Sequence, residues 1–281
     1  MKILTLNTHS FMEDGFEQKF NYLIKAIKHE KFNVIALQEV NQDVNAPFVN
    51  YSKLRKLGFI KSSDKIDVKR GNFALLLVER LRDEGLYLNW AYCKNHIGYD
   101  KFDEGVALLT NYKVNSADEF FISKNSSYDN YRTRKAIRLN TEDQYGNNRD
   151  FISVHMGWWD DTSDPFFDQW RNLTENIYKA KNGDVYLMGD FNSPSNIRNQ
   201  GYDLITSSGK WYDTYELAEI KDDGNTVVKK IDGWKDKDNV SAMRIDYVFK
   251  NNKEKVKSSN VIFNNKNYPI ISDHYGIVVE E

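Results

Sequence analysis

Two parts of the sequence place an apolar strand, a helix and a second apolar strand one after another, and this order limits the fold more than any other feature. "KILTLN" at residues 2–7 is a strand, apolar residues then recur at helical spacing, and "NVIALQEV" is a second strand. The order returns with "DFISVHMGWW", a helix over "PFFDQWRNLTENIYKAKNG" between Pro165 and Gly183, and the strand "DVYLMGDFN". Both parts are therefore βαβ signals.

The other segments of the chain decide how these units combine. A helix is expected over "NFALLLVERLRDEG", closed by Gly85, with strands near 87–93, 105–110 and 134–140. The C-terminal strands "MRIDYVFK", "KVKSSNVIF" and "YGIVVE" are too many and too short for one doubly wound parallel sheet. We therefore expect an α/β protein in four layers, in which two packed mixed β-sheets are flanked by helices.

No composition shift divides the chain. It has 281 residues and only four prolines, and no Ser/Gly-rich linker interrupts it, so a single domain over 1–281 is expected. Polar stretches rich in Asn, Ser and Asp are predicted to be loops on this domain. They lie at 41–50, 61–70, 123–133, 192–200 and 235–241.

The charge and the cysteine content limit which partners, metals and cellular compartments are expected. The net charge is -2, and basic and acidic residues are interleaved, which makes nucleic acid an unlikely partner because no basic stripe is present. Cys93 is the only cysteine, which excludes an internal disulfide or a cysteine-rich zinc site. Without an apolar leader or a membrane-length apolar run, the sequence predicts a soluble, cytoplasmic protein with no membrane association. It gives no indication of the oligomeric state.

Polar residues recur where apolar strands end. Alone, an acid in such a place is often a helix cap or an ion-pair partner, and a lone histidine is usually structural. Their joint occurrence is harder to explain in that way, and in open α/β sheets ligands bind outside the carboxyl ends of the strands. We therefore expect one pocket to collect Asn7, Gln38, Glu39, His155, Asp190, Asn192, Asp246, Asp273 and His274.

This set of side chains suits the hydrolysis of a phosphate ester. Oxygen ligands without cysteine favour a hard cation, Mg²⁺ first and Mn²⁺ as the alternative. Histidines paired with carboxylates can perform acid/base work on the ester. Metal and histidines together could activate water, neutralise the phosphoryl oxygens and assist a poor alkoxide leaving group.

The motifs and their order resemble the endonuclease/exonuclease/phosphatase superfamily, which includes deoxyribonuclease I, over nearly the whole chain. The motifs are "LTLNTH", "IALQEV", "EGVALL", "SVHMGWW", "MGDFNSP", "RIDYVF" and "SDHYGI". The resemblance implies a deoxyribonuclease I-like fold and a metal-dependent hydrolase.

The resemblance also implies roles for the acidic and amide residues. Glu39 would be the principal Mg²⁺ ligand, with Asn7 beside it and Asp273 near the metal. Asp190 would orient or deprotonate the attacking water. Asn192 would hold a phosphoryl oxygen and help to position that acid.

The same resemblance assigns the two histidines. His274 would contact the phosphate and be oriented by Asp246. His155, oriented by Glu104, would donate to the phosphoryl group or to the leaving oxygen.

The phosphate-binding residues are less firmly matched. Arg134 matches a family arginine that reaches the phosphate, although Arg132 is close enough to leave the assignment open. Many nucleases of the family have a phosphate-contacting tyrosine two positions before the Glu104 site, and this chain has Phe102 there. That difference removes a hydroxyl donor and argues against a nuclease.

Within the superfamily, the chain resembles the maltose 6'-phosphate phosphatases, on "MKILTLNTHSFME", "VIALQEVNQ", "NHIGYDKFDEGVALL", "HMGWW", "IDGW" and "RIDYVF". This resemblance predicts a phosphomonoesterase acting on a small phosphorylated sugar. His96, Trp158 and Trp159 would bind the substrate, although the tryptophan pair could equally cover a core. Further loop candidates are Tyr99, Asp100, Asp232 and Trp234.

Two other functions remain open. A phosphodiesterase, either an endonuclease or a sphingomyelinase-like enzyme, would use the same catalytic core. A catalytically inactive interaction module is disfavoured, because all the principal motif residues are present.

Overall fold

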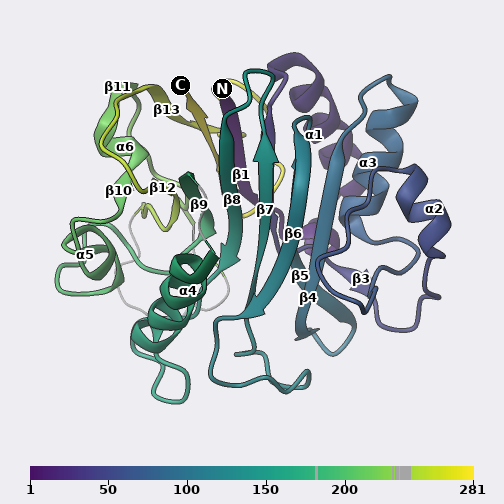
Figure 1. The fold of residues 1–281 in the computed structure, drawn as a ribbon, viewed down its shortest axis with the longest axis horizontal. Coiled ribbons are helices and arrows are strands. Elements are labelled where there is room, and N and C mark those ends of the chain that lie inside the picture. Colours follow the sequence, from purple (N-terminus) through teal and green to yellow (C-terminus); the bar gives the residue numbers. More distant parts are fainter. Residues whose placement is uncertain (181–182, 230, 232–233, 235–241) are drawn as a thin grey trace.

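Two mixed β-sheets pack face to face between layers of helices, which confirms the predicted fold class (Figure 1). The computed structural model describes residues 1–180, 183–229, 231, 234 and 242–281. The larger sheet has the order β11-β13-β14-β1-β2-β5-β3, with β4 also paired to β5. Its strands are β1 (Lys2–Asn7), β2 (Val34–Gln38), β3 (Gln42–Asp43), β4 (Asn89–Gly98), β5 (Phe102–Thr110), β11 (Ala218–Lys221), β13 (Val256–Ile262) and β14 (Gly276–Glu280).

The smaller sheet has the order β10-β12-β9-β8-β7-β6. Its strands are β6 (Lys113–Phe121), β7 (Lys135–Glu142), β8 (Asn148–His155), β9 (Asp184–Asp190), β10 (Tyr212–Asp213) and β12 (Asp246–Lys250). The helices are α1 (Phe16–Glu30), α2 (Tyr51–Lys56), α3 (Phe73–Asp83), α4 (Phe166–Ala180), α5 (Gly201–Thr206) and α6 (Thr214–Leu217), with a short 3₁₀ turn, η1 (Ser10–Met12).

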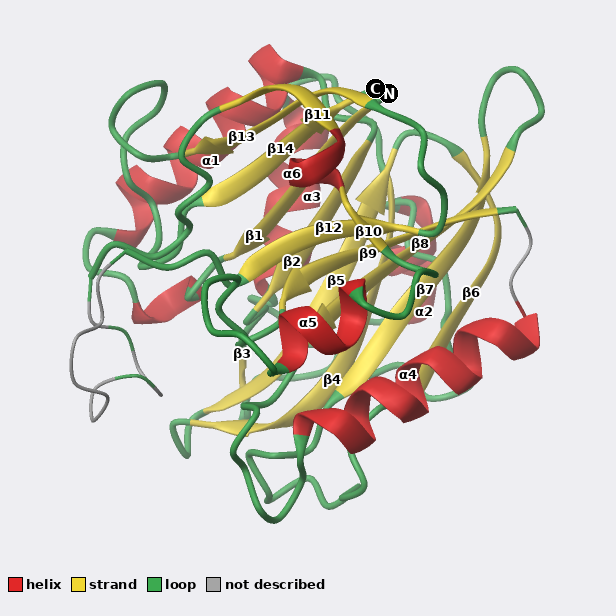
Figure 2. Cartoon of the chain, turned by 90° about the vertical axis from the view of Figure 1, so that its left-hand side faces the viewer, coloured by secondary structure: helices red, strands yellow, loops and turns green. Residues whose placement is uncertain are grey.

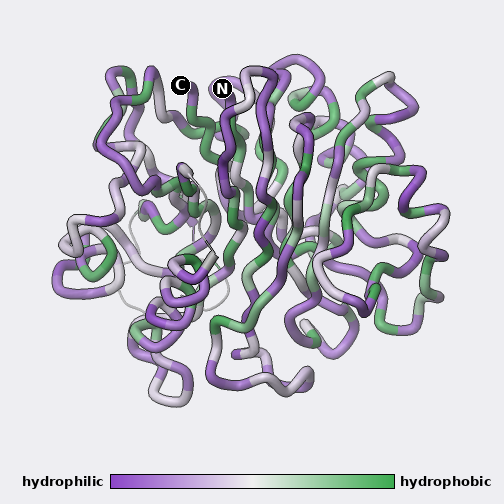
Figure 3. The backbone as a smooth tube through the Cα atoms, viewed as in Figure 1, coloured by the Kyte–Doolittle hydropathy of each residue, from purple (hydrophilic) through white to green (hydrophobic). Residues whose placement is uncertain are grey.

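Three apolar cores hold these layers together. The central core lies between the sheets, where Val34 and Leu108 of the larger sheet meet Leu139 and Phe151 of the smaller one. A second core joins α1 and α3 to the outer face of the larger sheet, and a third joins α4 and α5 to the outer face of the smaller sheet. Figure 2 shows α4 and α1 on opposite sides of the sheets. Figure 3 shows hydrophobic segments recurring along the strands, with mainly hydrophilic loops at the periphery.

Each sheet contains one of the two predicted βαβ units. β1 pairs in parallel with β2 across α1, and β8 pairs in parallel with β9 across α4. Most other pairings are antiparallel, for example β14 on β1 and β12 on β9, so both sheets are mixed as predicted. The two parallel pairs are the frame on which the strand-end residues are placed.

The helix over 73–83 has a local signal in the sequence at each of its ends, of which the closing glycine was predicted. The Asn72 side chain accepts a hydrogen bond from the Leu75 amide at 3.1 Å, which caps the first turn. Gly85 has a φ of 80°, a backbone conformation that L side chains rarely adopt, and it ends the helix as predicted.

Several elements were not predicted. β6 is the clearest case, because its sequence "KVNSADEFF" is polar and its residues are mostly exposed or half-buried at the sheet edge. It is a strand because it pairs with β7 along its length, a tertiary effect that local alternation does not reveal. The short helices α2 and α5 were also missed. The predicted loop at 235–241 lies outside the described residues.

Among the described helices, none combines the length and the apolar character that crossing a membrane would require.

Candidate active site

Strand register brings the polar strand ends together. In the larger sheet, Asn7 lies beside Gln38, and Glu39 follows directly. In the smaller sheet, His155 lies beside Asp190, and Asp246 at the start of β12 lies on the other side of Asp190. Parallel strands end at the same sheet edge, and the two sheets face each other, so the convergence follows from the topology.

A cavity of about 210 Å³ lies over these strand ends. Its floor is the set of enclosed acids and histidines Glu39, Glu104, His155, Asp190 and His274. Its rim is the set of more exposed side chains His9, Tyr99, Tyr131 and Trp158. The remaining described lining residues form the sides of the cavity: His96, Ile97, Gly98, Arg134, Asn192, Ile231 and Asp273.

Asn7 links the two sheets beneath the floor. Its side chain is fully buried, and its Nδ2 donates to Glu39 Oε1 at 2.9 Å and to Asp190 Oδ2 at 3.1 Å. Its Oδ1 accepts from the His9 backbone amide at 3.2 Å. One amide therefore holds the predicted metal ligand and the predicted base in fixed relation.

The surroundings of Glu39 fit a divalent cation. Burial, followed by the charges of Glu104 and Asp273, raises the pKa of Glu39 to about 8. Such a cluster of oxygen donors, whose mutual repulsion a cation would relieve, suits Mg²⁺ or Mn²⁺ better than softer metals. Glu39 also has a φ of 50°, a strained conformation of the kind that is retained at functional sites.

Asp190 lies between the two histidines. Its Oδ2 is 3.7 Å from His155 Nε2 and 3.8 Å from His274 Nε2. Its Oδ1 accepts from the Asn192 backbone amide at 2.8 Å. Burial, followed by the charge of Asp246, raises the pKa of Asp190 to about 7, which is suited to a group that exchanges protons near neutral pH.

The two histidines have opposite protonation states. His274 is buried, which lowers its pKa, but the charge and the 2.9 Å hydrogen bond of Asp246 and the charge of Asp190 raise that pKa well above its usual value. Burial, followed by the Arg134 cation, lowers the pKa of His155 well below its usual value. His274 is therefore a cation and His155 is neutral, a distinction that sequence could not make.

The predicted partner of His155 lies near it without a hydrogen bond. Glu104 Oε1 is 3.8 Å from His155 Nδ1, and this nitrogen has no hydrogen-bond partner among the described residues. Burial raises the pKa of Glu104. The orienting role of Glu104 therefore stays a prediction. It would require Glu104 Oε1 to come within hydrogen-bond distance of His155 Nδ1.

Arg134 and His96 form one side of the cavity. Arg134 Nη1 is 2.9 Å from His96 Nδ1, and Arg134 Nε has no partner among the described residues. Burial, followed by the Arg134 charge, lowers the pKa of His96 to about 3, so its imidazole is neutral. The alternative arginine, Arg132, instead pairs with Asp161 at 2.6 Å. The structure thus places Arg134, and not Arg132, among the lining residues.

The stretch "DFN" turns each side chain in a different direction. Phe191 is fully buried in the core beneath the smaller sheet. Asn192 Nδ2 donates to the Met156 carbonyl at 2.9 Å, and its Oδ1 accepts from Trp234 Nε1 at 3.0 Å. These bonds fix the Asn192 amide and leave one Nδ2 hydrogen for a phosphoryl oxygen, the role that remains a prediction.

The two neighbouring tryptophans are separated. Trp158 lines the cavity and packs against the small apolar cluster that includes Val227 and Ile231. Trp159 does not line the cavity, and its ring lies 6.1 Å from that of Phe166 over the core of the smaller sheet. The stacking expected of both residues therefore has a structural basis only at Trp158.

Two rim residues were missed by the sequence reasoning. His9 stands two positions after Asn7 in "LTLNTH", so its nearness to a predicted ligand was the available signal. Burial lowers the pKa of His9, but the hydrogen bond to Glu13 and the charges of Asp273 and Glu39 raise it to about 9. Tyr131 lies in the predicted loop 123–133, where no pattern distinguished it from its neighbours.

Comparison with known proteins gave a family match and similar solved structures. The model of the Endonuclease/Exonuclease/phosphatase family matches residues 4–274. An endonuclease/exonuclease/phosphatase family protein from Leptotrichia buccalis is similar at 35% identity and a TM-score of 0.83, with 100% of this chain and 98% of that chain covered. No curated protein gave a match.

More distant structures share the fold. A mannosyl-6-phosphatase from Bacteroides thetaiotaomicron is 17% identical, with a TM-score of 0.67 and coverage of 100% of this chain and 98% of that one. D. rerio TDP2, solved with a single-strand DNA product, is 14% identical, with a TM-score of 0.64 and coverage of 99% and 97%.

Proposed function

Because the chain belongs to the endonuclease/exonuclease/phosphatase family, whose members are metal-dependent hydrolases of phosphoric esters, we propose that it is a phosphomonoesterase acting on a phosphorylated sugar. Maltose 6'-phosphate is the first substrate to test, with maltose and phosphate as products. Mg²⁺ is the proposed metal, with Mn²⁺ as the alternative. The cytoplasmic location expected from the sequence stays a prediction.

The observation that carries this proposal is the charge of the cavity. Arg134 is the only lysine or arginine among the described residues that line it, whereas the acids Glu39, Glu104, Asp190 and Asp273 line it as well. A nucleic acid strand is bound through several phosphates, each met by basic groups. A small cavity of about 210 Å³, with one arginine and no lysine among its described lining residues, suits a single terminal phosphate.

The residues support in-line attack of water on that phosphate. Asp190, with its pKa near neutrality, would accept the proton of the attacking water. The His274 cation and Arg134 would stabilise the charge on the phosphoryl oxygens. Neutral His155 would lie near the phosphoryl group or the leaving oxygen, as the family resemblance implies.

Glu39, with Asn7 and Asp273 nearby, would hold the divalent cation. When bound, this cation supplies Lewis-acid polarisation of a phosphoryl oxygen and charge neutralisation. The chain's own part is to keep the carboxylates in place, which the Asn7 bridge between Glu39 and Asp190 does.

The name of the Bacteroides relative, a mannosyl-6-phosphatase, supports testing sugars phosphorylated at a primary hydroxyl. At 17% identity the similarity does not identify which sugar. The substrate panel should therefore include mannose 6-phosphate and glucose 6-phosphate beside maltose 6'-phosphate.

The test is phosphate release by the purified protein with Mg²⁺, with Mn²⁺ and with EDTA. We expect rapid, chelator-sensitive release from at least one sugar phosphate and little cleavage of bis-p-nitrophenyl phosphate. The converse result, plasmid nicking or diester cleavage without sugar phosphatase activity, would replace the proposal with the phosphodiesterase alternative, for which TDP2 is the structural precedent.

A further inference from the structure

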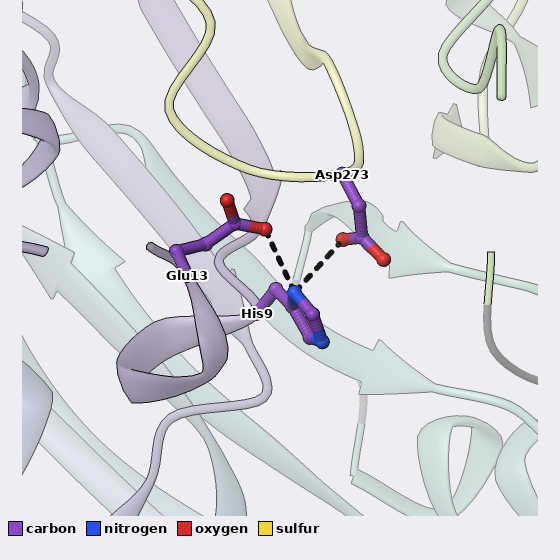
Figure 4. A group of neighbouring side chains, drawn as sticks. All are labelled: His9, Glu13 and Asp273. Atoms are coloured by element: carbon purple, nitrogen blue, oxygen red, sulfur yellow. Dashed lines mark hydrogen bonds and ion pairs between the residues drawn. The ribbon is translucent and has the colours of Figure 1, made fainter. Parts of the chain in front are cut away.

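A second group of ionisable side chains stands beside the floor, at the cavity mouth. His9 Nδ1 is 2.7 Å from Glu13 Oε1 and 3.7 Å from Asp273 Oδ1 (Figure 4). Figure 4 shows both carboxylates directed at this one nitrogen, while the other ring nitrogen, Nε2, points away from them. The three residues come from the turn after β1, from the segment after η1 and from the loop before β14.

The three side chains are close enough to surround a cation. The contacts of Glu13 with Lys19 and His9 indicate instead that Glu13 orients the His9 ring. The Lys19 ammonium contacts Glu13 Oε2, so a cationic group already neutralises this carboxylate from outside the cavity. Its other oxygen is engaged by His9. The chain from Lys19 through Glu13 to His9 is therefore a support that sets the orientation of one imidazole ring.

The orientation leaves Nε2 on the side of Tyr99. Tyr99 Oη is 3.5 Å from His9 Nε2, and both residues line the cavity. Tyr99 sits at the turn between β4 and β5, where Tyr99 and Asp100 have φ values of 53° and 51°. Two successive positive φ values define a tight hairpin turn, and Tyr99 on this turn lines the cavity.

Both side chains line the same cavity as the floor residues that would surround a phosphate. The His9 backbone amide donates to Asn7 Oδ1 at 3.2 Å, and Asn7 in turn holds Glu39 and Asp190. His9 is thus connected through Asn7 alone to Glu39 and Asp190, which would lie beside the phosphate. The substituent carried by the ester oxygen would extend from the floor toward the rim.

We propose that His9 and Tyr99 bind hydroxyl groups of the sugar ring that carries the phosphate, and that they determine specificity for a phosphorylated sugar over other phosphomonoesters. This inference rests on the proposed function and deepens it. An imidazole nitrogen and a phenol oxygen side by side can each form a hydrogen bond with a hydroxyl group. Trp158, elsewhere on the rim, offers an aromatic surface to the same ring.

The nearby phenylalanine does not provide this hydroxyl. Phe102 is buried, its ring lies 5.9 Å from that of Phe11, and it is not among the described lining residues. The position that carries a phosphate-contacting tyrosine in related nucleases is therefore apolar packing in this chain. Tyr99, three residues earlier and on the turn itself, presents a hydroxyl to the cavity instead.

The test compares two substrates that share the phosphate and differ in hydroxyl groups: maltose 6'-phosphate and p-nitrophenyl phosphate. The readout is the ratio of their kcat/KM values. Tyr99→Phe removes only one hydroxyl, and we expect the ratio to fall roughly threefold to tenfold, mainly through KM for the sugar. Glu13→Gln, which loosens the support of His9, should lower the ratio in the same direction.

Tyr145→Phe is the matched control. Tyr145 is 80% exposed in the turn between β7 and β8 and does not line the cavity, so its ratio should equal that of the wild type. Thermal unfolding of each variant reports whether the fold is kept. An equal loss on both substrates would mean a structural role and would overturn the inference, as would an unchanged ratio.

The wild-type protein separates this inference from the function on which it rests. Sugar phosphatase activity with a ratio insensitive to Tyr99→Phe overturns the role of the pair and leaves the proposed function standing. A wild-type protein that hydrolyses p-nitrophenyl phosphate or a diester, but no sugar phosphate, overturns both.

Discussion

The floor and the rim of the cavity differ in how the chain builds them. The floor residues His155 and Asp190 are the last residues of their strands, paired in register and only 6% and 2% exposed. The rim residues Tyr99 and Tyr131 lie on a hairpin turn and a loop and are 45% and 48% exposed. The floor is fixed by the sheets, whereas the rim depends on a few turns.

This difference indicates a division of work. Buried, mutually coupled charges such as Asp190 and His274 suit the chemical step, where small displacements are costly. Exposed aromatic and hydroxyl groups suit recognition of the part of the substrate that does not react. Substitutions on the floor should therefore lower kcat, and substitutions on the rim should raise KM or change selectivity.

The largest effect is expected on the floor at Asp190. Asp190→Ala removes the group proposed to accept a proton from water and the partner that faces both histidines. We expect kcat to fall by about 10²- to 10⁴-fold, with losses of orders of magnitude for His155→Ala and His274→Ala as well. Steady-state phosphate release measures this, and near-normal turnover in any one of the three would remove that residue from the chemical step.

Glu39 tests a different property of the floor, its affinity for metal. Glu39→Ala should abolish the dependence of activity and of thermal stability on the metal, because the proposed principal ligand is lost. The direct readout is the thermal unfolding temperature with and without Mg²⁺. We expect the wild type to be stabilised by metal and the variant to be indifferent to it.

A wild-type-like rise of the unfolding temperature in Glu39→Ala would place the metal elsewhere. Glu79→Ala is a control, because Glu79 is a surface glutamate of α3 paired with Lys53 at 2.8 Å. It should keep the full response to metal.

The pH dependence of metal binding should be smaller but measurable. The pKa of Glu39 is raised from 4.5 to about 8, so its carboxylate forms only as the pH approaches 8. A cation must displace that proton, and we expect apparent Mg²⁺ affinity to rise about tenfold or more between pH 6.5 and 8.5. Metal titrations followed by calorimetry at several pH values, with Glu39→Gln beside the wild type, provide the measurement.

The metal-free protein should respond to pH in the opposite sense. The folded state retains the Glu39 proton that the unfolded chain releases near its ordinary pKa of 4.5. The folded state therefore binds more protons than the unfolded chain between about 4.5 and 8, and this group's contribution to stability declines as the pH rises through that window. If the stability of Glu39→Gln declined by the same amount over this pH range, the effect would have to come from other ionisable groups.

The contrast between floor and rim also explains what the sequence could predict. The strands that end in Asn7, Glu39, His155 and Asp190 are apolar runs with an abrupt polar end, a local pattern that is legible without a structure. Their convergence follows from βαβ topology. The layers, the mixed sheets and the floor residues were accordingly predicted. The polar edge strand β6 was not, because it forms a strand only through its pairing with β7.

Two of the four rim residues, His9 and Tyr131, escaped prediction for a physical reason. Whether a loop residue faces a cavity depends on contacts made by distant segments, such as the support that Glu13 and Lys19 give to His9. The protonation states of His155 and His274 were equally out of reach, because they follow from burial together with the charges of Arg134 and Asp246, and only the fold sets that balance.

The smallest predicted effect concerns the adjacent tryptophans, which the sequence treated alike. Trp158→Ala removes an aromatic surface from the rim, and we expect KM for the sugar phosphate to rise several-fold, consistent with about 1 kcal/mol from one aromatic contact. Trp159→Ala should leave KM near the wild-type value and lower the unfolding temperature, because this ring covers the core near Phe166.

The pair is informative because each variant controls for the other. Both substitutions remove the same side chain from neighbouring positions, so a general disturbance of the segment after β8 would affect KM and stability in both. A rise in KM confined to Trp158→Ala would extend the rim to an aromatic surface for the sugar. If Trp159→Ala raised KM as much, Trp159 would take part in substrate binding although it does not line the cavity. The assignment of Trp158 to recognition and of Trp159 to core packing would then be wrong.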